Sequence, residues 1–185
     1  MKTVLALSLF LLANVLTAQE IKDFSLINTK DGKTVSLLGL RAPVMVVVFT
    51  SHECPFDNYY KERLKELVTQ YTGKVQFVLI NSNQEPQENI DQMAIHYKDV
   101  NVPYLADKDQ VAMEALGARK STEVFLISTS SGKMNVVYSG AIDDNPQVAK
   151  DVKQTFLKDA IEKVLAGQKI DVNTQRASGC TIRRK

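Results

Sequence analysis

A short apolar run in the first third of the chain, Val44–Thr50, constrains the fold more than any other feature. It is rich in β-branched residues and shows no polar alternation, which is typical of a strand buried on both faces. Pro55 then suits the first position of a helix, where its missing N–H costs nothing. Apolar residues follow at helical spacing, at Phe56, Tyr60, Leu64, Leu67, Val68 and Tyr71. The pattern predicts a buried strand that turns directly into an amphipathic helix.

Cys54 lies at this turn, as the residue that caps the predicted helix. Unpaired backbone N–H groups and the positive end of the helix dipole favour negative charge there, so they stabilise a thiolate. Glu53 and Asp57 flank the sulfur and would oppose a thiolate if they pointed at it, while a protonated His52 would compensate. We expect a reactive cysteine. The alternative is an inert buried cysteine that packs as a small hydrophobic residue.

The first 18 residues have the layout of a secretory signal peptide. One basic residue, Lys2, precedes an apolar stretch over 4–16, and cleavage is expected near Ala18. The stretch is short for a bilayer span and no basic stop-transfer cluster follows, so an uncleaved anchor is the weaker alternative. The sequence therefore predicts an exported protein, periplasmic or secreted, without stable membrane insertion after cleavage.

The remainder, 19–185, is long enough for one domain with a real core. Its charge is nearly balanced, because the formal net charge of +2 falls to +1 once Lys2 is removed, so nucleic acid is not an expected partner. Two cysteines, Cys54 and Cys180, cannot make a disulfide-dense scaffold. We divide the chain into a signal peptide (1–18), a globular domain (19–170) and a polar C-terminal tail (171–185) that carries Cys180.

The rest of the domain alternates between strand-like and helix-like segments. A strand, a helix and a strand in that order imply a parallel pair with a right-handed crossover, and a hairpin adds antiparallel strands. The order therefore predicts an α/β sandwich with a mixed sheet. The further expected elements are a hairpin-like entry (24–35), a second strand (75–80), a second helix (87–98), an extended segment (102–105), a short helix (110–116), a hairpin (124–138) and a last helix (147–166).

Two motifs stand out beside the cysteine-bearing turn, the Gly140-Ala141-Ile142-Asp143-Asp144-Asn145 loop and the Gly179-Cys180-Thr181-Ile182 segment. With the strand, hairpin and helix order of the second half, they resemble the exported peroxiredoxin-like (redoxin, AhpC/TSA-related) branch of the thioredoxin superfamily. The resemblance covers nearly all of 19–185. It implies a thioredoxin-like three-layer sandwich, with helices flanking a mixed central sheet, and thiol redox chemistry without a cofactor.

The chain departs from this branch at two positions. Members often carry Cys-x-x-Cys at the strand–helix turn, whereas Ser51 stands at the first position here, closer to the Thr-x-x-Cys of peroxidase-type relatives. The Ser51 hydroxyl would then hydrogen-bond the attacking peroxide; the alternative is an isosteric replacement of a lost cysteine. The family also places a cis-proline in the segment that docks substrates, and Thr122 stands there. A cis bond without proline costs ~3 kcal/mol, which favours a trans peptide at Thr122 but leaves both isomers open.

A peroxidase mechanism assigns roles to further residues. Cys54 would attack the peroxide, and Cys180 would resolve the sulfenic acid, within the chain or from another chain. The alternatives for Cys180 are a free tail thiol or a static bridge to Cys54. A cation must polarise the peroxide, and Arg119, on the loop predicted to face Cys54, is the candidate, with a solvated arginine as its alternative. Substrate contacts are expected from Thr50, His52, Pro55 and Thr122.

The leading hypothesis is an antioxidant, thiol-dependent oxidoreductase that reduces peroxide and is regenerated by an external thiol reductant. A thiol–disulfide oxidoreductase working on disulfide substrates is the second hypothesis, weakened because no nearer cysteine can resolve a mixed disulfide. A degenerate domain kept for protein interaction is a third. A metal-binding domain would use His52 and Cys54, and a closed site would need His96 or Cys180 to converge on them, since no third ligand is evident. His96 is expected at the surface or rim and has no partner ligand at i+4 or i−4. We therefore expect no metal site, and a homodimer is compatible with each hypothesis.

Overall fold

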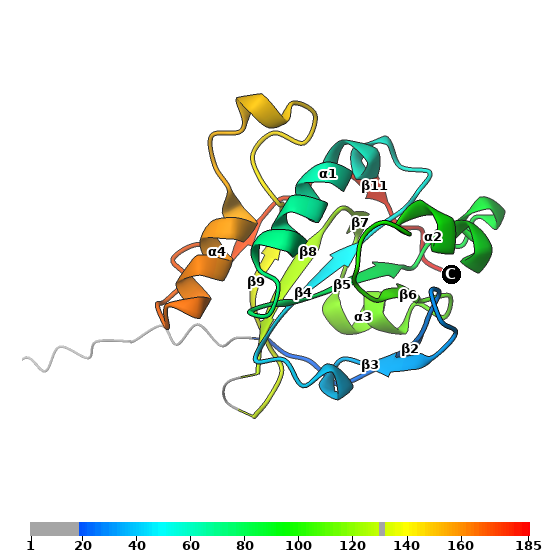
Figure 1. Cartoon of the computed structure of the whole chain (residues 1–185), viewed down its shortest axis with the longest axis horizontal. Helices are drawn as coiled ribbons and strands as arrows, with labels where there is room; N and C mark the ends of the chain where they lie inside the picture. The colour runs from blue at the N-terminus through cyan, green and yellow to red at the C-terminus, as the bar shows by residue number, and fades with distance from the viewer. Residues whose placement is uncertain (1–18, 130–131) are drawn as a thin grey trace, which may run out of the picture.

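The computed structural model describes residues 19–129 and 132–185, and the predicted signal peptide lies outside them (Figure 1). The strands are β1 Gln19–Glu20, β2 Ser25–Asn28, β3 Thr34–Ser36, β4 Val44–Phe49, β5 Gln76–Asn81, β6 Tyr104–Ala106, β7 Lys120–Ser121, β8 Val124–Ser128, β9 Asn135–Gly140, β10 Thr174–Gln175 and β11 Cys180–Thr181. The α-helices are α1 Pro55–Gln70, α2 Ile90–His96, α3 Val111–Leu116 and α4 Phe156–Leu165, with 3-10 turns η1 Leu38–Leu40, η2 Pro86–Glu88 and η3 Ala149–Asp151.

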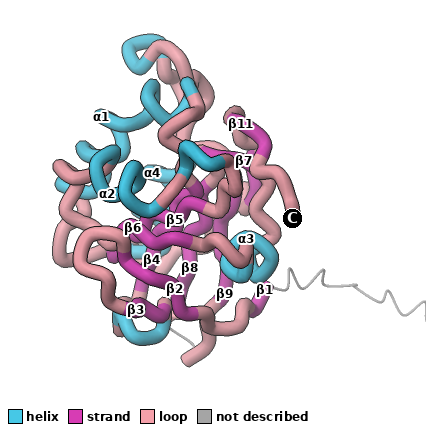
Figure 2. Tube along the Cα trace, turned by 90° about the vertical axis from the view of Figure 1, so that its right-hand side faces the viewer, coloured by secondary structure: helices cyan, strands magenta, loops and turns pink. Residues whose placement is uncertain are grey.

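One mixed sheet, in the order β1-β9-β8-β4-β5-β6-β2-β3, forms the centre of the described chain. The predicted strands at 44–50 and 75–80 form β4 and β5, and they pair in parallel as expected. On its other side β4 pairs antiparallel with β8, and β8 pairs antiparallel with β9. Helices lie on both sides of the sheet (Figure 2). The predicted thioredoxin-like three-layer fold is confirmed.

Burial on both faces explains the unbroken apolar sequence of β4. All six of its residues are buried. Val46 and Val48 belong to the core that also contains residues of α1, α2 and α4, whereas Val47 and Phe49 belong to the core that contains residues of α3. Successive side chains of a strand point to opposite faces, so a strand between two cores needs apolar residues at every position.

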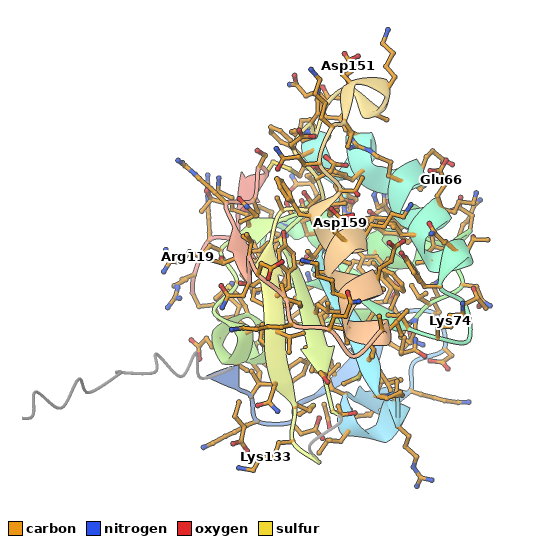
Figure 3. All side chains as sticks on the ribbon, turned by 90° about the vertical axis from the view of Figure 1, so that its left-hand side faces the viewer. Glu66, Lys74, Arg119, Lys133, Asp151 and Asp159 are labelled. Atoms are coloured by element: carbon orange, nitrogen blue, oxygen red, sulfur yellow. A yellow bond between two sulfur atoms is a disulfide. The ribbon has the colours of Figure 1, made fainter. Side chains whose placement is uncertain are left out.

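Two predicted helices are shorter than expected. The prediction of a last helix over 147–166 was wrong in its first half, because α4 begins at Phe156. The preceding segment instead forms η3 on a projecting turn, where Asp151 lies apart from Asp159 of α4 (Figure 3). The turn closes because Asp144 accepts a hydrogen bond from the Lys153 N–H at 2.9 Å. The helix predicted over 87–98 begins only at Ile90, because Asn89 caps it by accepting from the Gln92 N–H.

The segment 171–185 packs onto the domain along two edges. β10 pairs in parallel with β9. β11 pairs antiparallel with β7, and the two lie side by side in Figure 2. Both approaches are so close that only glycine fits. A Cβ on Gly140 would lie 1.7 Å from the carbonyl oxygen of Gln175, and a Cβ on Gly179 would lie 1.5 Å from that of Ser121. The glycines of the two motifs therefore have a structural reason: they let the tail lie against the sheet.

We expect Gly140→Ala to be severely destabilising, by about 3 kcal/mol or more, because a φ of +124° disfavours any side chain and the new Cβ would overlap Gln175. Urea unfolding monitored by circular dichroism measures the loss. The matched control is Gly73→Ala, at a φ of +78° with no atom within 4 Å of the added Cβ, which should cost only about 1 kcal/mol. Equal losses in the two variants would show that the tail does not hold this edge.

Candidate functional site

The two cysteines of the chain are bonded to each other. Cys54 caps α1 as predicted, and its sulfur forms a disulfide with Cys180, 126 residues further along, with the two Cα atoms 5.9 Å apart. Of the alternatives left open by the sequence, the structure shows the bridge within one chain. Cys54 is 1% exposed, whereas Cys180 is half-buried. The arrangement is an oxidised cysteine pair in which the tail-side residue is the more exposed.

Of the two isomers that the sequence left open, the Ser121–Thr122 peptide bond beside this pair has the cis form. Cys180 is the strand partner of Ser121 in the β7–β11 ladder, and the buried Thr122 hydroxyl donates to the Ser178 carbonyl at 3.2 Å. The tail therefore contacts the residues on both sides of this bond.

One buried carboxylate, that of Glu88, holds the whole turn before the cysteine. The Ser51 hydroxyl donates to it, His52 Nδ1 lies 2.8 Å from its Oε2, and the Glu53 N–H donates to its Oε1 at 3.3 Å. The hydroxyl proton of Ser51 is therefore directed at Glu88. His52 is also held on its other side, with Nε2 2.7 Å from the Gln87 carbonyl oxygen. Ser51 and His52 thus fix the turn that presents Cys54.

Glu88 reaches this position from η2 and is 1% exposed. Asn81, at the end of β5, donates to its Oε2 at 2.6 Å, and Lys108 Nζ donates to its carbonyl oxygen at 2.6 Å. Sequence reasoning missed Glu88, because a glutamate in a polar loop is usually solvated. The available signal was topological: polar residues follow two parallel strands whose carboxyl ends meet at one edge of the sheet.

A second buried carboxylate, that of Asp57, lies on the first turn of α1. Its Oδ2 accepts from the Tyr97 hydroxyl at 2.8 Å and lies 3.1 Å from His96 Nε2. Burial raises the pKa of Asp57 above its ordinary 3.8, and the hydrogen bonds from His96 and Tyr97 oppose that rise. The His96 side chain is only 15% exposed, and its ring centroid lies 5.7 Å from that of His52. Both histidines of the chain therefore meet beside the cysteine turn, each against a buried carboxylate.

The remaining candidate residues, Thr50, Pro55 and Arg119, differ in burial. Thr50 is fully buried and its hydroxyl donates to Tyr104 at 3.0 Å, a core contact. Pro55 occupies the first turn of α1 and is exposed. Arg119 is exposed at the edge of the molecule, where its backbone carbonyl accepts from the Ile182 N–H at 2.9 Å (Figure 3). The structure thus links Arg119 to the tail through its main chain.

The Ile-Asp-Asp-Asn motif anchors a loop on α1. Tyr60 donates to Asp143 Oδ1 at 3.0 Å, and the Arg63 guanidinium pairs with Oδ2 while it lies 4.1 Å from the Tyr60 ring centroid. Asp143 is buried, so this pairing satisfies its charge. The motif is accounted for by the fold. In the described part of the chain, no group of three or more His, Cys, Asp or Glu side chains is placed to hold a metal ion.

Comparison with known proteins gives one family and several solved structures. The AhpC/TSA family model matches residues 17–160. An uncharacterized conserved protein from Geobacillus kaustophilus is 26% identical, with a TM-score of 0.82, over 93% of this chain and 94% of that one. A hypothetical protein from Sinorhizobium meliloti is 29% identical, with a TM-score of 0.81, over 92% and 95%.

A more distant likeness shows the fold alone. A secreted Mycobacterium tuberculosis disulfide oxidoreductase is 16% identical, with a TM-score of 0.59, over 75% of this chain and 94% of that one. None of the curated proteins compared with the chain matches it. The two solved proteins that match over nearly the full length of both chains thus have no stated activity.

We expect Glu88→Ala to lower the free energy of unfolding by about 3 kcal/mol, since it leaves the buried Ser51 and Asn81 donors without their acceptor. Urea unfolding of the oxidised protein measures the change. The control is Glu53→Ala, which removes a carboxylate next to the cysteine whose side chain is 58% exposed and should change stability by no more than about 0.5 kcal/mol. A small effect of Glu88→Ala would contradict its role in holding the turn.

The raised pKa of Asp57 predicts a pH dependence of stability. The folded protein binds this proton more tightly than the unfolded chain, so the resulting stability is fully present below pH 3.8 and is lost as pH rises through the folded pKa. Asparagine cannot ionise, so Asp57→Asn should lose less stability than the wild type over that rise, measured by urea unfolding at a series of pH values.

Asp144→Asn is the control with the opposite sign. A hydrogen bond from the Lys153 N–H lowers the pKa of this exposed carboxyl below 3.8, so its contribution to stability is present above pH 3.8 and is lost as pH falls through the folded pKa. The two variants should therefore change the pH profile in opposite directions. A profile for Asp57→Asn that runs parallel to that of the wild type would refute the assignment.

Proposed function

Because the chain belongs to the AhpC/TSA family, we propose that it is a thiol-dependent oxidoreductase that cycles between a Cys54 and Cys180 dithiol and their disulfide. The observation that carries this proposal is the bond between the helix-capping cysteine and the tail cysteine. A helix N-terminus favours the thiolate of Cys54 once the bond is reduced. Cys180 is held against Ser121 in a strand pairing, so a partner sulfur is present when Cys54 is oxidised.

We propose peroxide as the oxidant. The Cys54 thiolate attacks one peroxide oxygen, the O–O bond breaks, and the leaving oxygen takes a proton and departs as water or an alcohol. Cys54 is then a sulfenic acid. The Cys180 thiolate attacks its sulfur, the S–O bond breaks, and the oxygen leaves as water while the disulfide forms. A resolving thiol so close limits over-oxidation, and the two electrons come from the two cysteines.

The different exposure of the two cysteine residues supports a direction for the return step. Cys54 is 1% exposed, so an external thiolate meets the half-buried Cys180 first. Attack on the Cys180 sulfur breaks the disulfide and releases Cys54 as the leaving thiolate, which the start of α1 stabilises. A second external thiol then frees Cys180. The partner is therefore a thiol reductant, and no cofactor enters the cycle.

We also propose that the protein is exported and released from the membrane. The N-terminal pattern supports cleavage and release to the periplasm or the medium, where such a disulfide persists. The secreted Mycobacterium tuberculosis structural neighbour is in keeping with export. Within the residues that the structure describes, no helix is long and apolar enough to cross a membrane.

Mass spectrometry after reduction and a stoichiometric pulse of hydrogen peroxide tests the proposal. The wild type should lose two hydrogen atoms as the disulfide forms, and Cys180→Ser should instead gain one oxygen on Cys54, because nothing resolves the sulfenic acid. Cys54→Ser, which keeps only the tail thiol, is the control and should do neither at the same dose. If Cys54 stays a thiol while oxidised glutathione still forms the disulfide, peroxide is not the oxidant.

A further inference from the structure

A surface hollow of about 730 Å³ lies beside the tail, and neither Cys54 nor Cys180 lines it. Its walls come from four parts of the chain, namely the end of α3, the β7–β8 segment, β9 and the tail residues 174–177. Small-molecule sites in proteins usually enclose about 300–1,000 Å³. The hollow therefore has the volume of a ligand site, and the redox cycle proposed above makes no use of it.

Three cationic side chains line the hollow, those of Arg119, Lys120 and Arg176, against a single carboxylate, that of Glu123 (Figure 3 labels Arg119). Among the described residues, none of these three side chains has a hydrogen-bond or ion-pair partner. The Glu123 carboxylate is engaged elsewhere, because its Oε2 accepts from the main-chain N–H groups of Arg119 and Lys120, at 2.7 and 3.2 Å. The hollow thus holds an excess of unpaired positive charge.

This excess distinguishes the hollow from four others on the described surface. In the hollow between α1 and η3, two cations accompany two carboxylates, and in the other three the carboxylates equal or outnumber the cations. Unpaired cations on an open protein surface are screened by water and salt. Three of them around one concave surface instead add up to a positive potential that attracts anions.

The lining also has an apolar part, formed mainly by Leu116, Phe125 and Val136. Leu116 and Phe125 are 3% and 4% exposed and belong to the core that contains residues of α3, and Val136 packs against the same core. Their exposed edges are therefore held in place by the packing beneath them. An inorganic ion would leave this apolar surface in contact with water, whereas an organic molecule would cover it and gain the free energy of apolar burial.

We infer that this hollow is a binding site for a small organic dianion. The apolar body of the ligand covers the edges of Leu116 and Phe125, and its phosphate or carboxylate groups pair with Arg119, Lys120 and Arg176. Guanidinium groups suit such oxyanions because they donate two parallel hydrogen bonds, and an ammonium group adds a point charge. The site does not depend on the redox chemistry, so its failure would leave the proposed function untouched.

Fluorescence titration of the oxidised full-length protein tests the site with four defined probes. 1-Naphthyl phosphate carries a dianion on an aromatic body, and 2,6-naphthalenedicarboxylate carries two carboxylates on the same kind of body. 1-Naphthol presents the body without the charge, and inorganic phosphate, added as a competitor, presents the charge without the body. The chain contains no tryptophan, so naphthyl emission is read against a low protein background.

1-Naphthyl phosphate should bind with a Kd of about 1 mM or tighter. Arg119→Gln, Lys120→Gln and Arg176→Gln should each weaken this binding by about fivefold or more, because each removes a charged partner of the anion. Added sodium chloride should weaken it as well. The matched controls are Arg41→Gln and Lys74→Gln, at exposed cations that do not line the hollow, and they should stay within about twofold of the wild type. Lys74 lies on the opposite side from Arg119 in Figure 3.

The dianionic naphthyl probes should bind at least about tenfold more tightly than 1-naphthol or inorganic phosphate. The tighter of the two identifies the anionic group as phosphate or carboxylate. If neither dianion binds, or if the double variant Arg119→Gln, Arg176→Gln is folded by circular dichroism and binds them as the wild type does, the site is refuted. Equal affinity for 1-naphthol would show that charge plays no part, and equal affinity for inorganic phosphate would overturn the organic class of the ligand.

Discussion

The burial of β4 on both faces is the constraint on which the rest of the structure depends. A strand enclosed by two cores has one fixed position, and its end delivers Ser51 to the edge where β5 also ends. The chain must leave the sheet there, and Pro55 begins α1 after a short turn. Cys54 is consequently presented at a helix N-terminus by a scaffold that cannot shift without opening both cores.

Polar groups at this edge of the sheet then hold the turn that carries Cys54. Glu88 contacts each of the three residues before the cysteine. Asp57, on the first turn of α1, pairs with His96. Neither carboxylate is exposed to solvent: Glu88 accepts hydrogen bonds from Ser51 and Asn81, whereas burial raises the pKa of Asp57 in spite of its contacts with His96 and Tyr97. The flanking charge of Asp57, which would oppose a thiolate if it pointed at the sulfur, is instead committed to His96 and Tyr97.

The tail supplies the second cysteine of the site. It lies on β9 and β7 because Gly140 and Gly179 leave no Cβ in the way, and it carries Cys180 to within disulfide distance of Cys54. In this arrangement Cys54 is 1% exposed.

The sequence by itself determined the strand–turn–helix unit, the α/β order and Cys54 as the helix cap, because periodicity, Pro55 and local propensity act over a few residues. It could not determine that Glu88 turns inward, that the Arg119 carbonyl pairs with the tail, or that the Ser121–Thr122 bond is cis. Those outcomes depend on groups far apart in the chain that meet only after folding. Long-range hydrogen bonds and close backbone approaches have no local pattern, so the tertiary structure alone decided them.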